Sequence, residues 1–214
     1  YGKTEPKPPS DSLKLDSFEN GFQLSKRGKP VFRYLSKPSD ESKKYAPHYS
    51  RSGYIHPLHS PSGKVVTGDY ASDHPHQHGL FFAWTKSTFR GKPTEFWNQA
   101  KKLGDVRFHR FLGQEDGKDS TSYRFEHLFT KGKDSDEPIL KETWRIEVPW
   151  KALPYHQFDL VSIQTCATKD PLLIQKYHYG GMAIRGNPQW LKKDKNGKPK
   201  GKMLTSEGKN AKNG

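Results

Sequence analysis

The chain has 214 residues, 31% of them hydrophobic and 13% aromatic, and 37 basic against 23 acidic residues give a formal net charge of +14. This length fits one domain, and the aromatic content favours strands over helices. No run approaches the roughly 20 apolar residues of a membrane-spanning helix. The charge could attract an anionic polysaccharide or nucleic acid, or simply reflect a soluble surface with two lysine-rich tails. Nucleic acid is disfavoured, because no RNA- or DNA-reading motif accompanies the charge.

The two ends differ in composition from the middle. Residues 1–11 are rich in proline and lysine, which predicts a flexible basic tail before a domain spanning 12–190. Residues 191–214 form a second lysine- and glycine-rich segment. No signal peptide is present, and the chain opens at Tyr1, which is consistent with a processed start.

Strand signals begin at residues 21–26 and 31–35, which a turn at 27–30 joins. Residues 54–59 and 64–67 are predicted to be the arms of a hairpin, with proline and glycine in its turn. This hairpin would bring His56 or His59 close to the histidine-rich segment that follows. A buried strand is expected at residues 80–84.

The second half of the chain has a plain β pattern. Residues 93–103 predict a short helix capped by Thr94 and ended by Gly104. Alternating apolar residues then predict strands at 106–112, 123–129, 140–148, 156–166 and 178–185. Regularly spaced strands separated by turns indicate an all-β fold, an antiparallel β-sandwich. Cys166, the single cysteine, is expected to be a buried structural thiol.

Three histidines at alternate positions, His74, His76 and His78, stand out among ten. An extended backbone would project them to one side, with Asp73 opposite. Pro75 cannot donate a ladder hydrogen bond, so the segment is an edge, a bulge or a loop.

Three roles are open for this segment. His74 and His76 could bind one zinc or copper ion, with a third ligand from His109, His56 or a carboxylate. Uncharged imidazoles could instead transfer protons. In the purely structural alternative, the histidines bond to the backbone and to Asp73 or Asp69.

Two further places combine groups suited to chemistry. Glu142 and His127 lie on apolar strand faces, either as a tuned acid–base pair or as satisfied polar residues of the core. Tyr179 and Arg185 lie in a segment with another tyrosine and His178. Aromatic faces suit sugar rings and arginine suits carboxylates, although surface tyrosines at a sheet edge would look the same.

Several segments together resemble the bacterial "PmoA family", also called the methane oxygenase PmoA family. The resemblance covers about residues 52–208, including Tyr54-Ile-His-Pro-Leu, Asp73-His-Pro-His and Leu204-Thr-Ser-Glu-Gly. It implies a β-sandwich similar to the galactose-mutarotase supersandwich, lacking the last strands of longer members. Methane oxidation is not implied, because the methane monooxygenase subunit of that name is an integral membrane protein. The matched positions are His56, Asp73, His74, His76, Gly79, His109, Tyr179, Gly180, Gly181, Arg185 and Glu207.

The resemblance also implies polysaccharide degradation by an exported, periplasmic or secreted protein. Our leading hypothesis is a mutarotase- or lyase-like reaction on a carbohydrate or another small anionic substrate. One alternative is a metalloprotein with His74 and His76 on zinc or copper; the other is a non-catalytic module that holds an acidic glycan. The predicted catalytic residues are His74, His76, His109 and His178, and the predicted substrate-binding residues are His56, Tyr179, Arg185 and Glu142.

Overall fold

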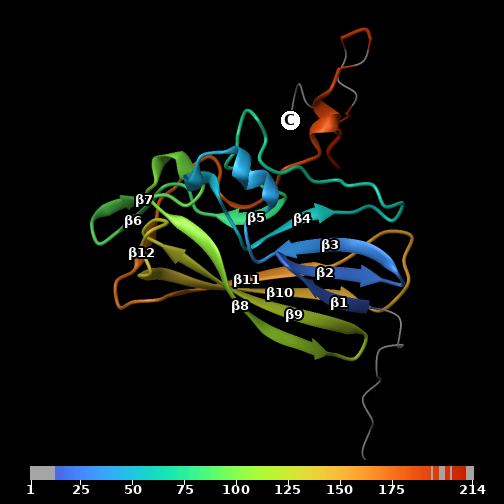
Figure 1. Cartoon of the computed structure of the whole chain (residues 1–214), viewed down its shortest axis with the longest axis horizontal. Helices are drawn as coiled ribbons and strands as arrows, with labels where there is room; N and C mark the ends of the chain where they lie inside the picture. The colour runs from blue at the N-terminus through green and yellow to red at the C-terminus, as the bar shows by residue number, and fades with distance from the viewer. Residues whose placement is uncertain (1–12, 194, 198–200, 203, 211–214) are drawn as a thin grey trace, which may run out of the picture.

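The computed structural model describes residues 13–193, 195–197, 201–202 and 204–210. Within them, three antiparallel sheets form a sandwich-like arrangement (Figure 1), and no α-helix is present in this part of the chain. The predicted all-β class is therefore confirmed. The expected basic tail at 1–11 lies outside the described residues, as do parts of the predicted C-terminal segment.

The larger sheet has six strands in the order β1-β2-β3-β4-β5-β13. The first three strands form a meander, and β13 returns from the far end of the chain to pair with β5. The strand bounds are β1 Leu13–Phe18, β2 Gly21–Lys26, β3 Lys29–Leu35, β4 Tyr54–Leu58, β5 Leu80–Ala83 and β13 Gly181–Ile184.

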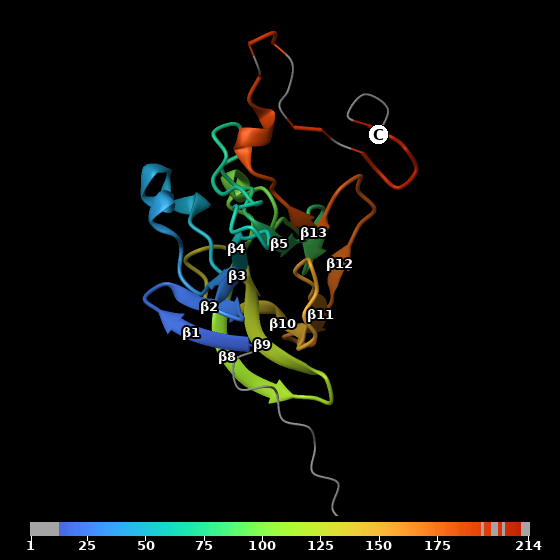
Figure 2. The ribbon, with the colours of Figure 1, turned by 90° about the vertical axis from the view of Figure 1, so that its right-hand side faces the viewer.

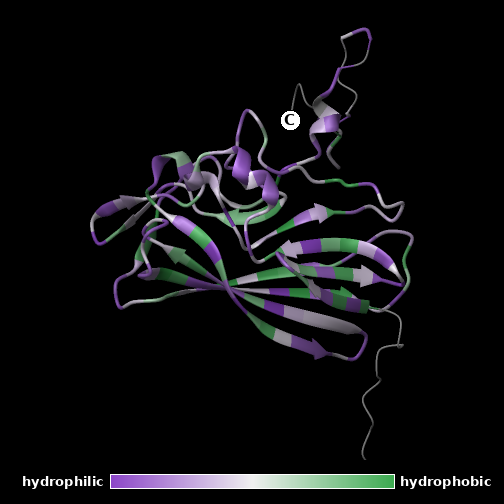
Figure 3. Ribbon diagram, in the orientation of Figure 1, coloured by the Kyte–Doolittle hydropathy of each residue, from purple (hydrophilic) through white to green (hydrophobic). Residues whose placement is uncertain are grey.

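The second sheet has the order β11-β10-β9-β8 and contains the long strands. Hydrophobic and hydrophilic residues alternate along them (Figure 3), and burial alternates from Leu140 to Val148 in the same way. This is the pattern of strands with one face packed on a core. The bounds are β8 Asp105–Asp116, β9 Ser120–Thr130, β10 Pro138–Pro149 and β11 Asp159–Cys166.

A small third sheet, β12-β6-β7, lies at one end of the sandwich, on the left in Figure 1. Its strands are β6 Ser87–Phe89, β7 Lys92–Thr94 and β12 Leu172–Ile174. The described residues also include four short 3₁₀ helices. Three lie between strands, η1 Asp40–Lys44, η2 Pro47–Tyr49 and η3 Gln99–Lys101, and η4 Pro188–Leu191 follows β13.

Two clusters of buried side chains hold the layers together. In the first, β2–β4 pack on β9 and β10, and Tyr34 stacks on Phe125 with ring centroids 3.9 Å apart. In the second, Phe81 of β5 and Phe89 of β6 share a core with Phe96 and Phe129. Figure 2 shows β1–β3 lying against β8–β10. This packing fixes the positions of β4 and β5, whose connection carries the candidate site.

Two local predictions were wrong. The helix expected at 93–103 is replaced by β7, an irregular segment and the single turn η3, whose cap is Asn98 and not Thr94. The side chains of Phe96 and Trp97 are buried here, so tertiary packing outweighs the helical signal. Cys166 is exposed, because it ends the edge strand β11.

Candidate functional site

The histidine-rich segment belongs to the connection between β4 and β5, which we call the histidine loop (residues 59–79). It is held against the chain that follows β13. Gly68 N donates to Arg185 O at 2.8 Å, and Arg185 N donates to Gly79 O at 2.7 Å. Figures 1 and 2 both show the loop and this chain on the same upper side of the molecule. Residues more than 100 positions apart therefore meet here.

The backbone turns twice within the cluster. His74 N donates to Ala71 O and Gln77 N to His74 O, each at 2.9 Å. Alternate residues therefore do not share a face, and the expected one-sided row of histidines is wrong. The side chain of His74 is 48% exposed, whereas that of His78 is fully buried.

His78 anchors the loop in the core. Its Nδ1 lies 2.8 Å from Asp69 Oδ1, and the other oxygen of Asp69 accepts hydrogen bonds from the hydroxyls of Tyr54 at 2.8 Å and Ser39 at 3.0 Å. One carboxylate thus joins three separate parts of the chain. A methyl group on Gly79 would lie 2.0 Å from the carbonyl oxygen of Ile55, so only glycine allows the backbone to approach β4 this closely.

Burial lowers the pKa of His78, against the opposing effect of Asp69. The ring is therefore neutral at pH 7 and donates its Nδ1 proton to Asp69. Its Nε2 is then an acceptor, and the side-chain amide of Gln99 lies 3.4 Å from it, in position to donate an N–H. The structural alternative proposed for the cluster describes His78 correctly. Gln99 was not anticipated, because nothing in the sequence links it to a histidine 21 positions earlier.

The outer part of the loop carries a different group of side chains. His74 Nδ1 lies 2.9 Å from Asp73 Oδ2, and the guanidinium of Arg185 donates to Asp73 Oδ1 at 3.0 Å and to Gln77 Oε1 at 2.7 Å. The hydrogen bond from His74 lowers the pKa of Asp73, and the charge of Arg185 adds to this effect. Asp73 is thus an anion that orients both of these partners.

His76 lies beside His74, with ring centroids 5.6 Å apart in an edge-on geometry. It is partly buried, and burial lowers its pKa to about 4, with smaller contributions from two neighbouring histidines and Arg185. His76 is therefore an uncharged proton acceptor at neutral pH. The structure brings together His74, His76 and Arg185 of the predicted site.

His56 of β4 was expected to lie close to the histidine-rich segment, and the charge of His78 does act on it. Its Nδ1 is 2.9 Å from the hydroxyl of Thr67, and burial lowers its pKa while the charge of Asp69 opposes this. The second arm of the hairpin is not a strand; it is held by an isolated bridge between His59 and Val65.

The other predicted site residues lie elsewhere. His109 is on β8 in the four-stranded sheet, exposed and 3.8 Å from Glu126, so it does not supply the expected neighbour to His74. His178 and Tyr179 form an exposed aromatic group before β13, and Tyr179 packs on Trp97 at 5.2 Å. No contact between the described residues joins these side chains directly to His74 or His76.

Glu142 was expected to contact substrate, but it is fully buried between the sheets. Its carboxylate lies 2.8 Å from His127 Nδ1 and accepts hydrogen bonds from Ser162 at 2.5 Å and Gln164 at 3.1 Å. Nε2 of His127 is hydrogen-bonded to the hydroxyl of Tyr34. The pair is therefore a satisfied polar network of the core.

The described residues contain no group of three or more His, Cys, Asp and Glu side chains arranged to hold a metal ion. The same part of the chain has no helix with the length and apolar character needed to cross a bilayer.

A family model matches residues 22–213, nearly the whole chain. The chain belongs to the DUF6807 family. This family is described as one of unknown function, so DUF6807 membership assigns no activity to the histidine loop, and the resemblance to the PmoA family stays a prediction. No curated protein and no solved structure matches the chain.

Proposed function

We propose that the histidine loop is the acid–base site of a carbohydrate-processing enzyme with a mutarotase- or lyase-like reaction. The observation that carries the proposal is the juxtaposition of a neutral His76 with the Asp73–His74 pair. Asp73 holds the Nδ1 proton of His74, so the exposed Nε2 of that ring can exchange a proton with a substrate. Two imidazoles 5.6 Å apart can then act on the two sides of one sugar.

Arg185 supports an anionic sugar as substrate. Two of its five N–H donors are used by Gln77 and Asp73, and the remaining donors can bind a carboxylate. In a lyase-like step, His76 would remove the proton next to the carboxylate of a uronate residue while the glycosidic C–O bond breaks. His74 would enter this step with protons on both ring nitrogens and protonate the leaving oxygen from Nε2, so His76 gains one proton and His74 loses one. Such a polysaccharide substrate fits an exported protein.

The test is activity on a polyuronate, followed by the absorbance of the new double bond, and on freshly dissolved hexose, followed by optical rotation. His74→Gln and His76→Gln should each lower the rate by about 10²–10⁴-fold. His109→Gln is the matched control, because it removes an exposed imidazole on the other sheet.

The outcomes separate the three hypotheses. Full activity in His76→Gln would refute the acid–base role. A stoichiometric zinc or copper ion that is lost in His76→Ala would favour a metalloprotein. Tight glycan binding that survives the double replacement of His74 and His76, without turnover, would favour a binding module.

A further inference from the structure

A cavity of about 620 Å³ lies between η2, η3 and the turn that joins β9 to β10, and neither His74 nor His76 lines it. This volume is within the range of small-molecule sites, about 300–1,000 Å³. Its walls come from three separate parts of the chain, so the cavity exists only in the folded protein. The lining residues that carry the argument are His48, Gln99, Lys102, Lys131, Lys133 and Asp134.

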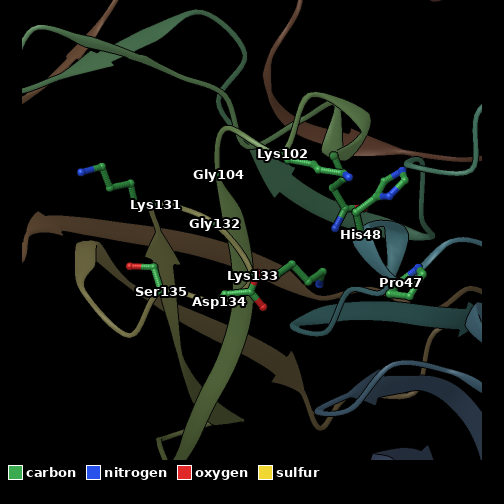
Figure 4. Close-up of a pocket in the computed structure, with 10 residues that line it drawn as sticks. Pro47, His48, Lys102, Gly104, Lys131, Gly132, Lys133, Asp134 and Ser135 are labelled. Carbon is green, nitrogen blue, oxygen red and sulfur yellow. The ribbon is translucent and has the colours of Figure 1, made fainter.

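The lining is strongly basic. Three lysines and one aspartate line the cavity, and neither Lys102 nor Lys131 has an ion-pair partner among the described residues. Lys133 differs, because its ammonium group pairs with Asp105 at 3.1 Å and bonds to the carbonyl of Ser50. Figure 4 shows Lys102 directed toward His48, while the ammonium of Lys131 points away. An anion would therefore meet at least one uncompensated positive charge at this cavity.

A buried amide reaches the same cavity. Gln99 is only 2% exposed, and its Oε1 lies toward Nε2 of His78. Its amide nitrogen is buried and has no hydrogen-bond partner among the described residues, although the side chain lines the cavity. Because the neutral His78 presents Nε2 as an acceptor, the amide turned around would donate to that nitrogen and leave its own oxygen without a partner among the described residues. An unsatisfied buried polar atom is costly, so a polar ligand or water that bonds to it stabilises the site.

We propose that this cavity binds a sugar that carries a carboxylate, with the anionic group at Lys102 and a hydroxyl group at the amide of Gln99. The polar side chain of Ser135 and the main chain at Gly104 and Gly132 line the rest of the cavity and suit a hydroxyl-rich ring. The site is independent of proton transfer at the histidine loop, because neither His74 nor His76 lines it.

The test is binding of sodium glucuronate to the whole chain, measured by NMR chemical-shift changes and calorimetry, with glucose and sodium acetate as comparisons. We expect a dissociation constant of about 1 mM or tighter for glucuronate, and weaker binding of both comparison compounds. Lys102→Gln should weaken glucuronate binding about fivefold. The control Lys118→Gln, which removes the same charge from an exposed turn, should leave binding unchanged.

His48 provides a second readout. Burial lowers its pKa, and the charges of Lys102 and Lys133 lower it further. A bound carboxylate should therefore raise the pKa of His48, while the signals of His74 and His76 stay in place. The His76→Gln variant should bind glucuronate as the unchanged protein does.

The proposal would be overturned by no glucuronate binding, by equal losses in Lys102→Gln and Lys118→Gln, or by acetate binding as tight as glucuronate. Shifts confined to His74 and His76 would also overturn it, because they would place the anion at the histidine loop. None of these results depends on whether the protein turns over a substrate, so the two proposals fail separately.

Discussion

Replacing Glu142 with glutamine tests whether the core depends on a buried charge. The side chains of Glu142 and His127 are both fully buried, and three donors converge on the carboxylate: His127, Ser162 and Gln164. The amide of glutamine has nearly the same shape but only one acceptor oxygen. At least one of the three donors must then face an N–H group or remain unpaired.

The magnitude depends on how many donors lose their partner. One unsatisfied buried donor costs about 1–3 kcal/mol, which is the loss we expect for Glu142→Gln. Glu142→Leu leaves all three donors without an acceptor and should cost about 3–5 kcal/mol. Exposed Glu115 on β8 is the control, and its replacement by glutamine should change the stability by less than about 0.5 kcal/mol.

The pH dependence has a definite sign. Burial on its own raises the pKa of Glu142, but the hydrogen bonds and charge of His127, together with Ser162 and Gln164, hold it below the ordinary value. The carboxylate therefore stabilises the fold above its unfolded pKa, about 4.3, and this contribution is lost as the pH falls through the folded pKa. The difference between the unchanged chain and Glu142→Gln should shrink in acid.

Urea unfolding at neutral and acidic pH, with circular dichroism as the probe, gives the free energies for all four chains. A loss below about 0.5 kcal/mol in Glu142→Gln, or a difference that does not change with pH, would show that the network is not an ionic one.

The histidine loop supports three more tests. Asp69→Asn should destabilise the fold by about 2–4 kcal/mol in urea unfolding, because a buried carboxylate with three partners loses its charge; a negligible loss would contradict its role. Burial lowers the pKa of His78, so the unfolded chain binds a proton that the folded chain excludes. The free energy of unfolding should then decrease as the pH is lowered from about 6.5, by up to about 1.4 kcal/mol per pH unit. A melting temperature that does not change with pH would refute this. Arg185→Lys removes the paired contacts with Gln77 and Asp73, so hydrogen exchange of the loop amides should rise several-fold while global stability falls by less than about 1 kcal/mol.

The strands were predictable where the signal is local. Alternation over residues 123–129 and 140–148 matches the buried face of β9 and β10 in the structure. β1, β6, β7 and β12 were missed as strands, and three of these have only three residues each. Strands this short carry almost no periodic signal, and pairing with distant parts of the chain decides them.

The site was predictable only in part for the same reason. Asp73 and Asp69 were anticipated as partners of histidines, because they lie close in sequence to His74 and His78. Arg185 joins them through the pairing of β13 with β5, which no short pattern shows. His109 was misplaced for the same reason. It lies on β8 in the other sheet, and strand order, not a sequence motif, decides which loops become neighbours.

His78 is buried, whereas His74 and His76 lie on the outer part of the histidine loop, and this difference determines which positions of the loop accept mutation. His78 is fully buried and bonded to Asp69, so we expect most replacements at this position to destabilise the fold. His74 is bound to the exposed Asp73, and His76 contacts the ring of His74, so we expect replacements at these two positions to leave the fold intact. New catalytic properties could therefore be selected at those two sites on an unaltered scaffold.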